Sequence, residues 1–285
     1  MTSAKVFTAA LAAALLLTTM ASLVMVTQNS QLSSENSANA TRLRMNTILE
    51  SGQNAVEKEL AQVRNLTFNL ALSLRDTGLN GTAARAELNA SLAASPYAID
   101  IATFDTRGII QAVEPEQYRY LEGVDLSGGN KTKELLLYKV PTLSNTFASR
   151  DIARGSGYAC PVFNQSGVFI GAVSTLFNVS TLMKAVLPQL TYGTGFTWWA
   201  MQLDGTEIFD TDVTRIGHNL LYGPDYVNFP QVQALGWRMV NETSGHGSYS
   251  YLFSPAQLHV VNKECYWGTV GAEGLQWRLV LARLV

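Results

Sequence analysis

The residues best suited to chemistry gather in one stretch, WWAMQLDGTEIFDTDVTRIGHNL, at 198–220. It carries four carboxylates and one imidazole, at Asp204, Glu207, Asp210, Asp212 and His218. Such groups serve as metal ligands and as general acids or bases. The calcium-loop pattern Asp-x-Asp-x-Asp-Gly-x5-Glu is incomplete here, which argues against a metal. Asp204 followed by glycine is instead a strong hairpin signal, because both residues tolerate the positive φ of a tight turn.

Signatures of other chemistries are incomplete as well. The three histidines stand apart, without zinc-ligand spacing. Gly155-Ser156-Gly157 lacks the spacing of a nucleophile elbow, and Gly128-Gly129-Asn130 lacks the end of a phosphate loop. We therefore expect no catalytic residues, no metal and no cofactor. For Cys160 and Cys265 the sequence favours two buried thiols, and a disulfide between them stays open.

Composition describes a globular chain with little charge. Of 285 residues, 47% are hydrophobic and 15% are charged, and the formal net charge is −2. This is enough apolar material for a core. No run of Lys or Arg exceeds two residues, so a nucleic-acid partner is not expected.

The N-terminal segment VFTAALAAALLLTTMASLVMV, residues 6–26, is apolar or small throughout. A helix of this length spans the hydrocarbon core of a bilayer. Lys5 precedes it and the next basic residue is Arg42, so the positive-inside rule places the remainder outside the cell. We favour an uncleaved single-pass anchor over a signal peptide cleaved near Ala21, because the apolar run is long for a signal core. Cleavage would make the protein secreted.

Asn-x-Ser/Thr acceptors are frequent, which fits an exported, glycosylated surface. Chance predicts roughly three such sites. The sequence has eight, at Asn39, Asn65, Asn80, Asn89, Asn130, Asn164, Asn178 and Asn241. The alternative explanation is a composition rich in Asn, Ser and Thr.

A long helix is expected over residues 30–76. Leu49, Val56, Val63 and Leu70 recur every seven residues, which keeps them on one face. The polar start of the segment is expected to form an exposed stalk or a partner contact, and such helices can pair into a homodimer. A short helix should follow at 82–94 before Ser95-Pro96.

Two similar units of about 90 residues follow the helices. Each begins with a hairpin, continues through a helical insert and closes with antiparallel strands. The first has its turns at 105–108 and 164–167, and strand-like SNTFAS (144–149) between them. We predict an α+β fold with two antiparallel sheets behind a long helix. The expected divisions are an anchor or signal at 1–28, a stalk and short helix at 29–95, and lobes at 96–190 and 191–285.

This order of elements resembles the double Cache (dCache) family of extracellular sensors, in which two stacked PAS-like lobes stand on a long helix. Three stretches carry the resemblance: CPVFNQSGVFIGAVSTLFNVSTLM, MQLDGTEIFDTDVTRIGHNLL and GTVGAEGLQWRLVLARL. They are similar to a Pro-Val hairpin of the first lobe, an Asp-Gly hairpin of the second, and the final hairpin. The resemblance covers about residues 30–285.

The resemblance implies a ligand pocket in the membrane-distal lobe, between sheet and insert. Family members that bind amino acids use an Arg with aromatics on the insert and an Asp in the last strand. Here the insert reads NKTKELLLY and Leu176 takes the Asp position, so an α-amino acid is disfavoured. Aromatic walls with anion partners would instead suit a small carboxylate. The expected ligand-binding residues are Tyr118, Tyr120, Lys131, Tyr138, Phe147, Arg150, Tyr158 and Ser174.

The function expected from this resemblance is sensing or binding of a small molecule outside the membrane. The chain ends at Val285 directly after a strand, so a signalling or transport partner in the membrane is expected to supply the output. An alternative is a structural or adhesive surface glycoprotein without a ligand. A secreted hydrolase is a third hypothesis, and no motif supports it.

Overall fold

The computed structural model describes residues 2–148, 154–254 and 259–285, apart from the side chains of 2–17, 251–254 and 259. Two compact units divide the chain, Met1–Thr47 and Ile48–Val285. The first unit is helical throughout its described length. The second contains the end of the long helix and both sheets.

The expected long helix is present as α1 (Thr2–Thr77). From Ile48 onward, its seven-residue stripe is the buried face, and Leu49, Val56, Val63 and Leu70 are each at most 6% exposed. Within the described residues, no helix is both long enough and apolar enough to cross a membrane. Residues 6–17 of the expected anchor lie outside the described side chains.

The short helix α2 (Gly81–Ala94) follows α1 and is capped by Asn80. The Asn80 carboxamide oxygen accepts a hydrogen bond from the backbone N–H of Gly81, 2.7 Å away. Side-chain acceptors at this position satisfy backbone donors that a helix start leaves without partners.

The first sheet has the strand order β2-β1-β5-β4-β3, with antiparallel neighbours throughout. Its strands are β1 (Ala98–Asp105), β2 (Ile110–Glu114), β3 (Thr142–Leu143), β4 (Ser156–Phe163) and β5 (Phe169–Phe177). The insert between β2 and β4 contains η1 (Glu116–Leu121) and α3 (Asn130–Tyr138). Helices α4 (Val179–Val186) and η2 (Pro188–Thr191) lead to the second sheet.

The second sheet repeats this order as β7-β6-β10-β9-β8. Its strands are β6 (Thr197–Gln202), β7 (Glu207–Asp210), β8 (Gly245–Ser254), β9 (His259–Val270) and β10 (Trp277–Leu284). Its insert contains η3 (Val213–Arg215), η4 (Pro224–Tyr226) and α5 (Pro230–Asn241). The predicted α+β class with a long helix and two antiparallel sheets is confirmed.

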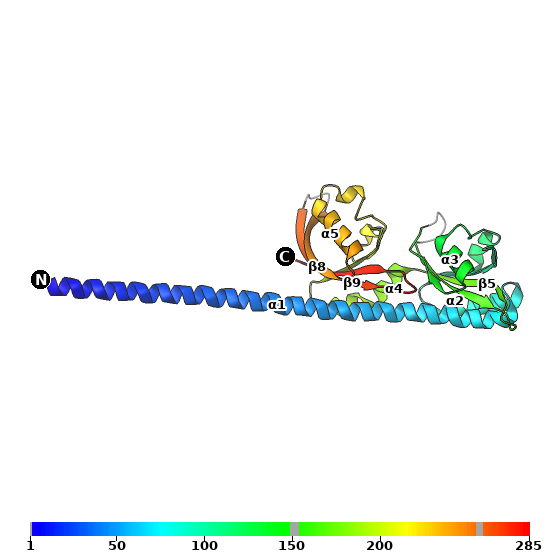
Figure 1. The fold of residues 1–285 in the computed structure, drawn as a ribbon, viewed down its shortest axis with the longest axis horizontal. Coiled ribbons are helices and arrows are strands. Elements are labelled where there is room, and N and C mark those ends of the chain that lie inside the picture. Colours follow the sequence, from blue (N-terminus) through cyan, green and yellow to red (C-terminus); the bar gives the residue numbers. More distant parts are fainter. Residues whose placement is uncertain (1, 149–153, 255–258) are drawn as a thin grey trace. The chain divides into compact units, whose positions relative to one another are not determined.

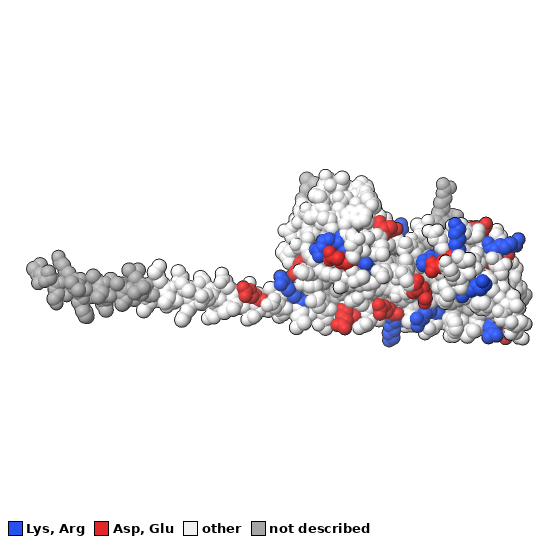
Figure 2. All heavy atoms as spheres, in the orientation of Figure 1, with Lys and Arg blue, Asp and Glu red and all other residues white. Residues whose placement is uncertain are grey.

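Each sheet has a helix face, which meets α1, and an insert face, which its own insert covers (Figure 1). On the helix face of the first sheet, Thr67 of α1 donates a hydrogen bond to Thr175 of β5 at 2.8 Å. On the second, Gln53 of α1 donates to the carbonyl of Thr269 at 2.8 Å. Figure 2 shows acidic and basic side chains interspersed over the drawn face of Ile48–Val285, without an extended area of one sign.

The strand expected at SNTFAS (144–149) does not form in its described residues, 144–148. In the described part of SNTFAS, Phe147 forms an isolated bridge to Gly155, and β3 covers only Thr142–Leu143 before it. The Ser144 hydroxyl instead donates to the carbonyl of Asn145 at 2.9 Å and accepts from the Gly157 N–H. Such local side-chain hydrogen bonds compete with a regular ladder.

Candidate ligand-binding face of the first sheet

The register of the first sheet places small residues in rows across its insert face. Ala102 of β1 lies opposite Ser174 of β5, which lies opposite Ala159 of β4. Residues directly opposite each other in an antiparallel pair point to the same face. The centre of the insert face therefore has little side-chain bulk.

Asp100 stands in the adjoining row of this face. It pairs with Leu176, which pairs with Gly157 on its other side. Asp100 is 5% exposed. Among the residues that the structure describes, no hydrogen bond or ion pair reaches its carboxylate. Burial alone raises the pKa of this carboxyl from an ordinary 3.8 to about 7, because a charge without partners is poorly solvated there.

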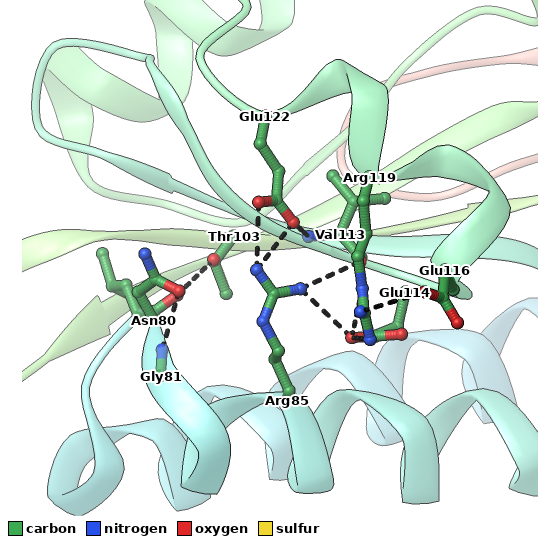
Figure 3. A network of polar contacts seen from close by, with 10 residues as sticks. Asn80, Gly81, Arg85, Thr103, Val113, Glu114, Glu116, Arg119 and Glu122 are labelled. Carbon is green, nitrogen blue, oxygen red and sulfur yellow. Dashed lines mark hydrogen bonds and ion pairs between the residues drawn. The ribbon is translucent and has the colours of Figure 1, made fainter.

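A second buried carboxylate of the same sheet, Glu114, has ion-pair partners and serves as a comparison. Glu114, at the end of β2, is 1% exposed. Its Oε1 lies 3.1 Å from Nη1 of Arg85 in α2 and 2.6 Å from Nη2 of Arg119 in η1. Arg85 also contacts Glu122 at 2.8 Å, as the close view of this network shows (Figure 3). These ion pairs join α2 to β2 and to the start of the insert.

The contrast between the two acids makes Asp100 a candidate partner for a cationic ligand. A buried carboxylate is costly unless a cation or hydrogen-bond donors compensate it. Glu114 has both arginines, whereas no described group compensates Asp100. A ligand with a protonated amine would supply the missing partner.

The register also corrects the argument made from Leu176. The sequence shows an apolar residue where the family carries an Asp, and an ammonium ligand therefore appeared to lose its carboxylate. In the structure, Asp100 lies directly opposite Leu176 on the neighbouring strand. A carboxylate is thus present in the same row, supplied by β1 in place of β5.

Some of the predicted ligand-binding residues share the insert face. Tyr118 of η1 packs against the buried cluster of Ala102, Ile110 and Val113. Ser174 is half-buried in the row beside Asp100. These two lie on the same face as Asp100 and belong with it in a candidate site.

The other predicted residues are placed differently. Tyr158 is on the helix face, is 1% exposed and donates a hydrogen bond to Glu273 at 2.6 Å. Lys131 forms an ion pair with Glu134 within α3 at 2.7 Å. Arg150 lies outside the described residues. The remaining three predicted residues are exposed aromatics, Tyr120, Tyr138 and Phe147.

The Asp-Gly stretch forms the predicted turn between β6 and β7. Gly205 has φ +88°, and the Thr206 N–H donates to Oδ1 of Asp204 at 2.9 Å. No group of three His, Cys, Asp or Glu able to hold a metal occurs in the part of the chain that the structure describes.

The cysteines are two buried free thiols, as the sequence favoured. Burial is the main cause that raises the pKa of both Cys160 and Cys265 to about 12. Reactive cysteines have low pKa values and are accessible, so both thiols are packing groups.

The predicted glycosylation acceptors differ in exposure. Asn164 and Asn178 are half-buried, and the other six are exposed. The Asn164 oxygen accepts from two backbone N–H groups of its turn, and the Asn178 oxygen caps α4. Turn and cap formation therefore accounts for part of the excess of Asn, and glycosylation stays a prediction.

Two antiparallel sheets in tandem, each between a shared long helix and its own insert, define the class of PAS-like double sensor domains. Residues 59–179 match the family described as "HK/GC/Chemotaxis protein-like, sensor domain". The matched segment is similar to that family, and the fold is that of sensor domains of the dCache, PAS-like type. The resemblance inferred from the sequence is thereby confirmed.

Solved structures of sensor domains are similar over most of the chain. An extracellular ligand binding receptor from Desulfohalobium retbaense is 26% identical with a TM-score of 0.69, and the match covers 84% of this chain and 40% of the receptor. The ligand-binding domain of the Pseudomonas aeruginosa amino acid chemoreceptor PctB, in complex with L-Gln, is 16% identical with a TM-score of 0.58, covering 84% and 89%.

The ligand-binding domain of the Pseudomonas fluorescens chemoreceptor CtaA, in complex with L-serine, is 12% identical with a TM-score of 0.59, covering 87% of this chain and 98% of that one. No curated protein sequence matches the chain. The chain is therefore similar to extracellular ligand-binding sensor domains.

Proposed function

We propose that this protein is a membrane-anchored extracytoplasmic sensor that binds a small ligand bearing a protonated amine on the insert face of the first sheet. The observation that carries the proposal is Asp100, a carboxylate at 5% exposure without a described partner. Tyr118 and Ser174 complete the site as an aromatic wall and a hydroxyl. Ala102 and Ala159, which lie opposite Ser174, add little side-chain bulk beside them.

Charge decides between an amine and the small carboxylate expected from the sequence. Lys131, an expected anion partner, is 2.7 Å from Glu134. A carboxylate ligand next to Asp100 would bring two negative groups together in a buried place, which is unfavourable. The chemoreceptor domains with amino acids bound have ligands that carry an ammonium group.

The anchor, the partner and the assembly are part of the same proposal. Residues 6–26 support the anchor by composition alone. The similarity to chemoreceptor and kinase-type sensor domains supports a signalling or transport partner that reads the ligand state. A homodimer through the stalk helix, the lobe boundaries at 95 and 190, and glycosylation at the exposed acceptors remain proposals.

A purely structural or adhesive role is less well supported, because the buried Asp100 would then lower the stability of the fold without serving a function. Stability alone would favour an apolar residue at this position, as its row partner Leu176 shows. Buried groups that reduce stability are commonly retained at functional sites.

Calorimetric titration of the full chain in a mild detergent tests the amine site. The probes are ethylamine, ethanolamine and L-serine, with ethanol as the uncharged comparison and chloride as the anionic one. We expect saturable binding of at least one ammonium compound, weakened about tenfold to a hundredfold by Asp100→Asn, as for a lost charge-assisted hydrogen bond.

Asp204→Asn is the matched control, because Asn supports the same exposed turn. It should leave the affinity unchanged. Absence of saturable binding of every ammonium probe, or equal affinity in the Asp100→Asn variant, would contradict the assignment.

A further inference from the structure

A second polar site lies on the insert face of the second sheet. A cavity of about 120 Å³ lies there, with lining residues from the sheet and from its insert, α5 included. The stretch with the four carboxylates contributes much of its wall, through Glu207, Asp210 and Arg215. Lys263 of β9 and Tyr249 of β8 complete the wall from strands later in the chain.

The cavity wall includes a hydrogen-bond donor that the fold leaves without an acceptor. Trp199 of β6 is 6% exposed, and its indole Nε1 is buried with no partner among the described residues. Buried N–H groups of Trp normally find a partner. Trp199 lies opposite both Asp210 of β7 and Val280 of β10, which places its side chain on the insert face.

Two cations line the same cavity. The Lys263 Nζ lies 3.3 Å from the hydroxyl oxygen of Thr197. The Arg215 guanidinium carbon is 5.9 Å from the centroid of the Tyr226 ring, and its Nε lies 3.8 Å from Oδ2 of Asp212. Burial is the main cause that lowers the pKa of Lys263, and the charge of Asp210 opposes it; a ligand anion near the ammonium group would act in the same direction as Asp210.

The carboxylates of the cavity are already hydrogen-bonded within the protein. Glu207 accepts from the hydroxyl of Tyr226. Asp210 accepts from the backbone N–H of Asp212 at 2.7 Å. Asp212 accepts from the backbone N–H and the hydroxyl of Thr214, at 3.1 and 2.7 Å.

The protonation of Glu207 limits the negative charge in the cavity. Burial raises the pKa of its carboxyl to about 8, which keeps most of it neutral near pH 7. The indole N–H of Trp199 has no acceptor among the described residues, whereas the carboxylates already have donors. The cavity therefore favours a ligand that accepts hydrogen bonds.

The remaining wall is apolar and the space is small. Leu220, Val232 and Leu235 line the cavity with the indole of Trp199. An apolar cavity of about 150 Å³ holds a benzene molecule. The second-sheet cavity therefore accommodates roughly five or six non-hydrogen atoms, with one polar end and a short apolar part.

We infer that the second sheet binds a short-chain monocarboxylate, with the carboxylate at Trp199, Lys263 and Arg215 and the alkyl group against Leu220, Val232 and Leu235. This site is separate from the amine site proposed on the first sheet. It takes a ligand of opposite charge, so the two proposals can fail independently.

Titration calorimetry with acetate, propionate and butyrate tests the site on the full chain, at fixed ionic strength, with chloride and inorganic phosphate as comparison anions. We expect saturable binding that strengthens from acetate to propionate. Hexanoate, with eight non-hydrogen atoms, should bind at least about tenfold more weakly than propionate, because it exceeds the space.

Trp199→Phe removes the indole N–H and should weaken propionate about tenfold, as one hydrogen bond to a charged group predicts. Trp198→Phe is the matched control. Its Nε1 is also without a described partner, but Trp198 packs on the helix face against Gly52. It should leave propionate affinity unchanged.

Asp210→Asn tests the sign of the ligand's charge. It removes a negative charge from the wall, so propionate should bind roughly threefold to tenfold more tightly. Weaker binding in this variant would show that the ligand is a cation and would overturn the inference. Absence of binding up to tens of millimolar, or an equal loss in both tryptophan variants, would overturn it as well.

Discussion

Asp100→Asn should stabilise the unliganded protein, and the gain should grow with pH. In the folded chain, burial raises the pKa of Asp100 to about 7 from an ordinary 3.8. The folded state therefore holds a proton that the unfolded state has lost throughout this interval. A group with a raised pKa gives its full stability below pH 3.8, and this stability is lost as pH rises through 7.

The magnitude follows from the difference of about three pKa units. Each unit corresponds to about 1.4 kcal/mol, so ionised Asp100 lowers the free energy of unfolding by up to about 4 kcal/mol above pH 8. At pH 5 the unfolded carboxyl has released its proton and the folded one has not. The cost is then only about 1.5 kcal/mol.

Urea denaturation of the full chain and of Asp100→Asn, followed by tryptophan fluorescence from pH 4 to 8.5, measures this difference. The two free energies of unfolding should converge near pH 4 and separate by about 2.5 kcal/mol between pH 5 and 8. Other buried acids titrate in both proteins and cancel in the difference. A constant difference across this range would show that Asp100 is already compensated in the folded protein, and the amine site would lose its basis.

Three further outcomes test other parts of the structure. Glu114→Gln should lower the free energy of unfolding by about 2–4 kcal/mol in denaturant titrations, since it leaves two arginines without their shared carboxylate, and a loss below about 0.5 kcal/mol would contradict the role of that network. Gly52→Ala should cost about 1–3 kcal/mol in the same assay, because its Cβ would lie 2.4 Å from the Trp198 ring, and an unchanged midpoint would show that α1 is not closely packed there. Cys160 and Cys265 should react with a thiol reagent at pH 8 only at the rate of unfolding, because both are buried with pKa values near 12, and rapid labelling of the native chain would refute their packing.

Local patterns in the sequence were sufficient for the elements of the fold. The seven-residue stripe of Leu49, Val56, Val63 and Leu70 gave the buried face of α1, because helical periodicity depends only on nearby residues. Asp204 marked its hairpin for the same reason. The prediction of a strand at 144–149 was wrong for the described residues 144–148, because Ser144 forms side-chain hydrogen bonds that an alternating pattern does not reveal.

The residues of the proposed amine site could be predicted only in part, because their positions relative to one another depend on register. Tyr118 and Ser174 were expected by analogy with the family, whereas Asp100 was not among the expected residues. Asp100 is the single charged residue in the strand-like segment YAIDIATF. A charge within an apolar strand needs a compensating group, and this requirement is the sequence signal that points to Asp100. The second-sheet cavity was missed because Lys263 joins the carboxylate stretch only across the sheet.

The row of Asp100, Leu176 and Gly157 shows whether packing requires a carboxylate at position 100. Leu176 shows that this environment accepts an apolar side chain, and Gly157 shows that it does not require bulk. Packing therefore does not explain the carboxylate at position 100. An ammonium ligand would convert the cost of its ionisation into binding free energy, because it compensates a charge that has no partner among the described residues. Binding should release the proton from Asp100 below pH 7 and tighten as pH rises toward that value, which links ligand occupancy to the stability of the first sheet through one side chain.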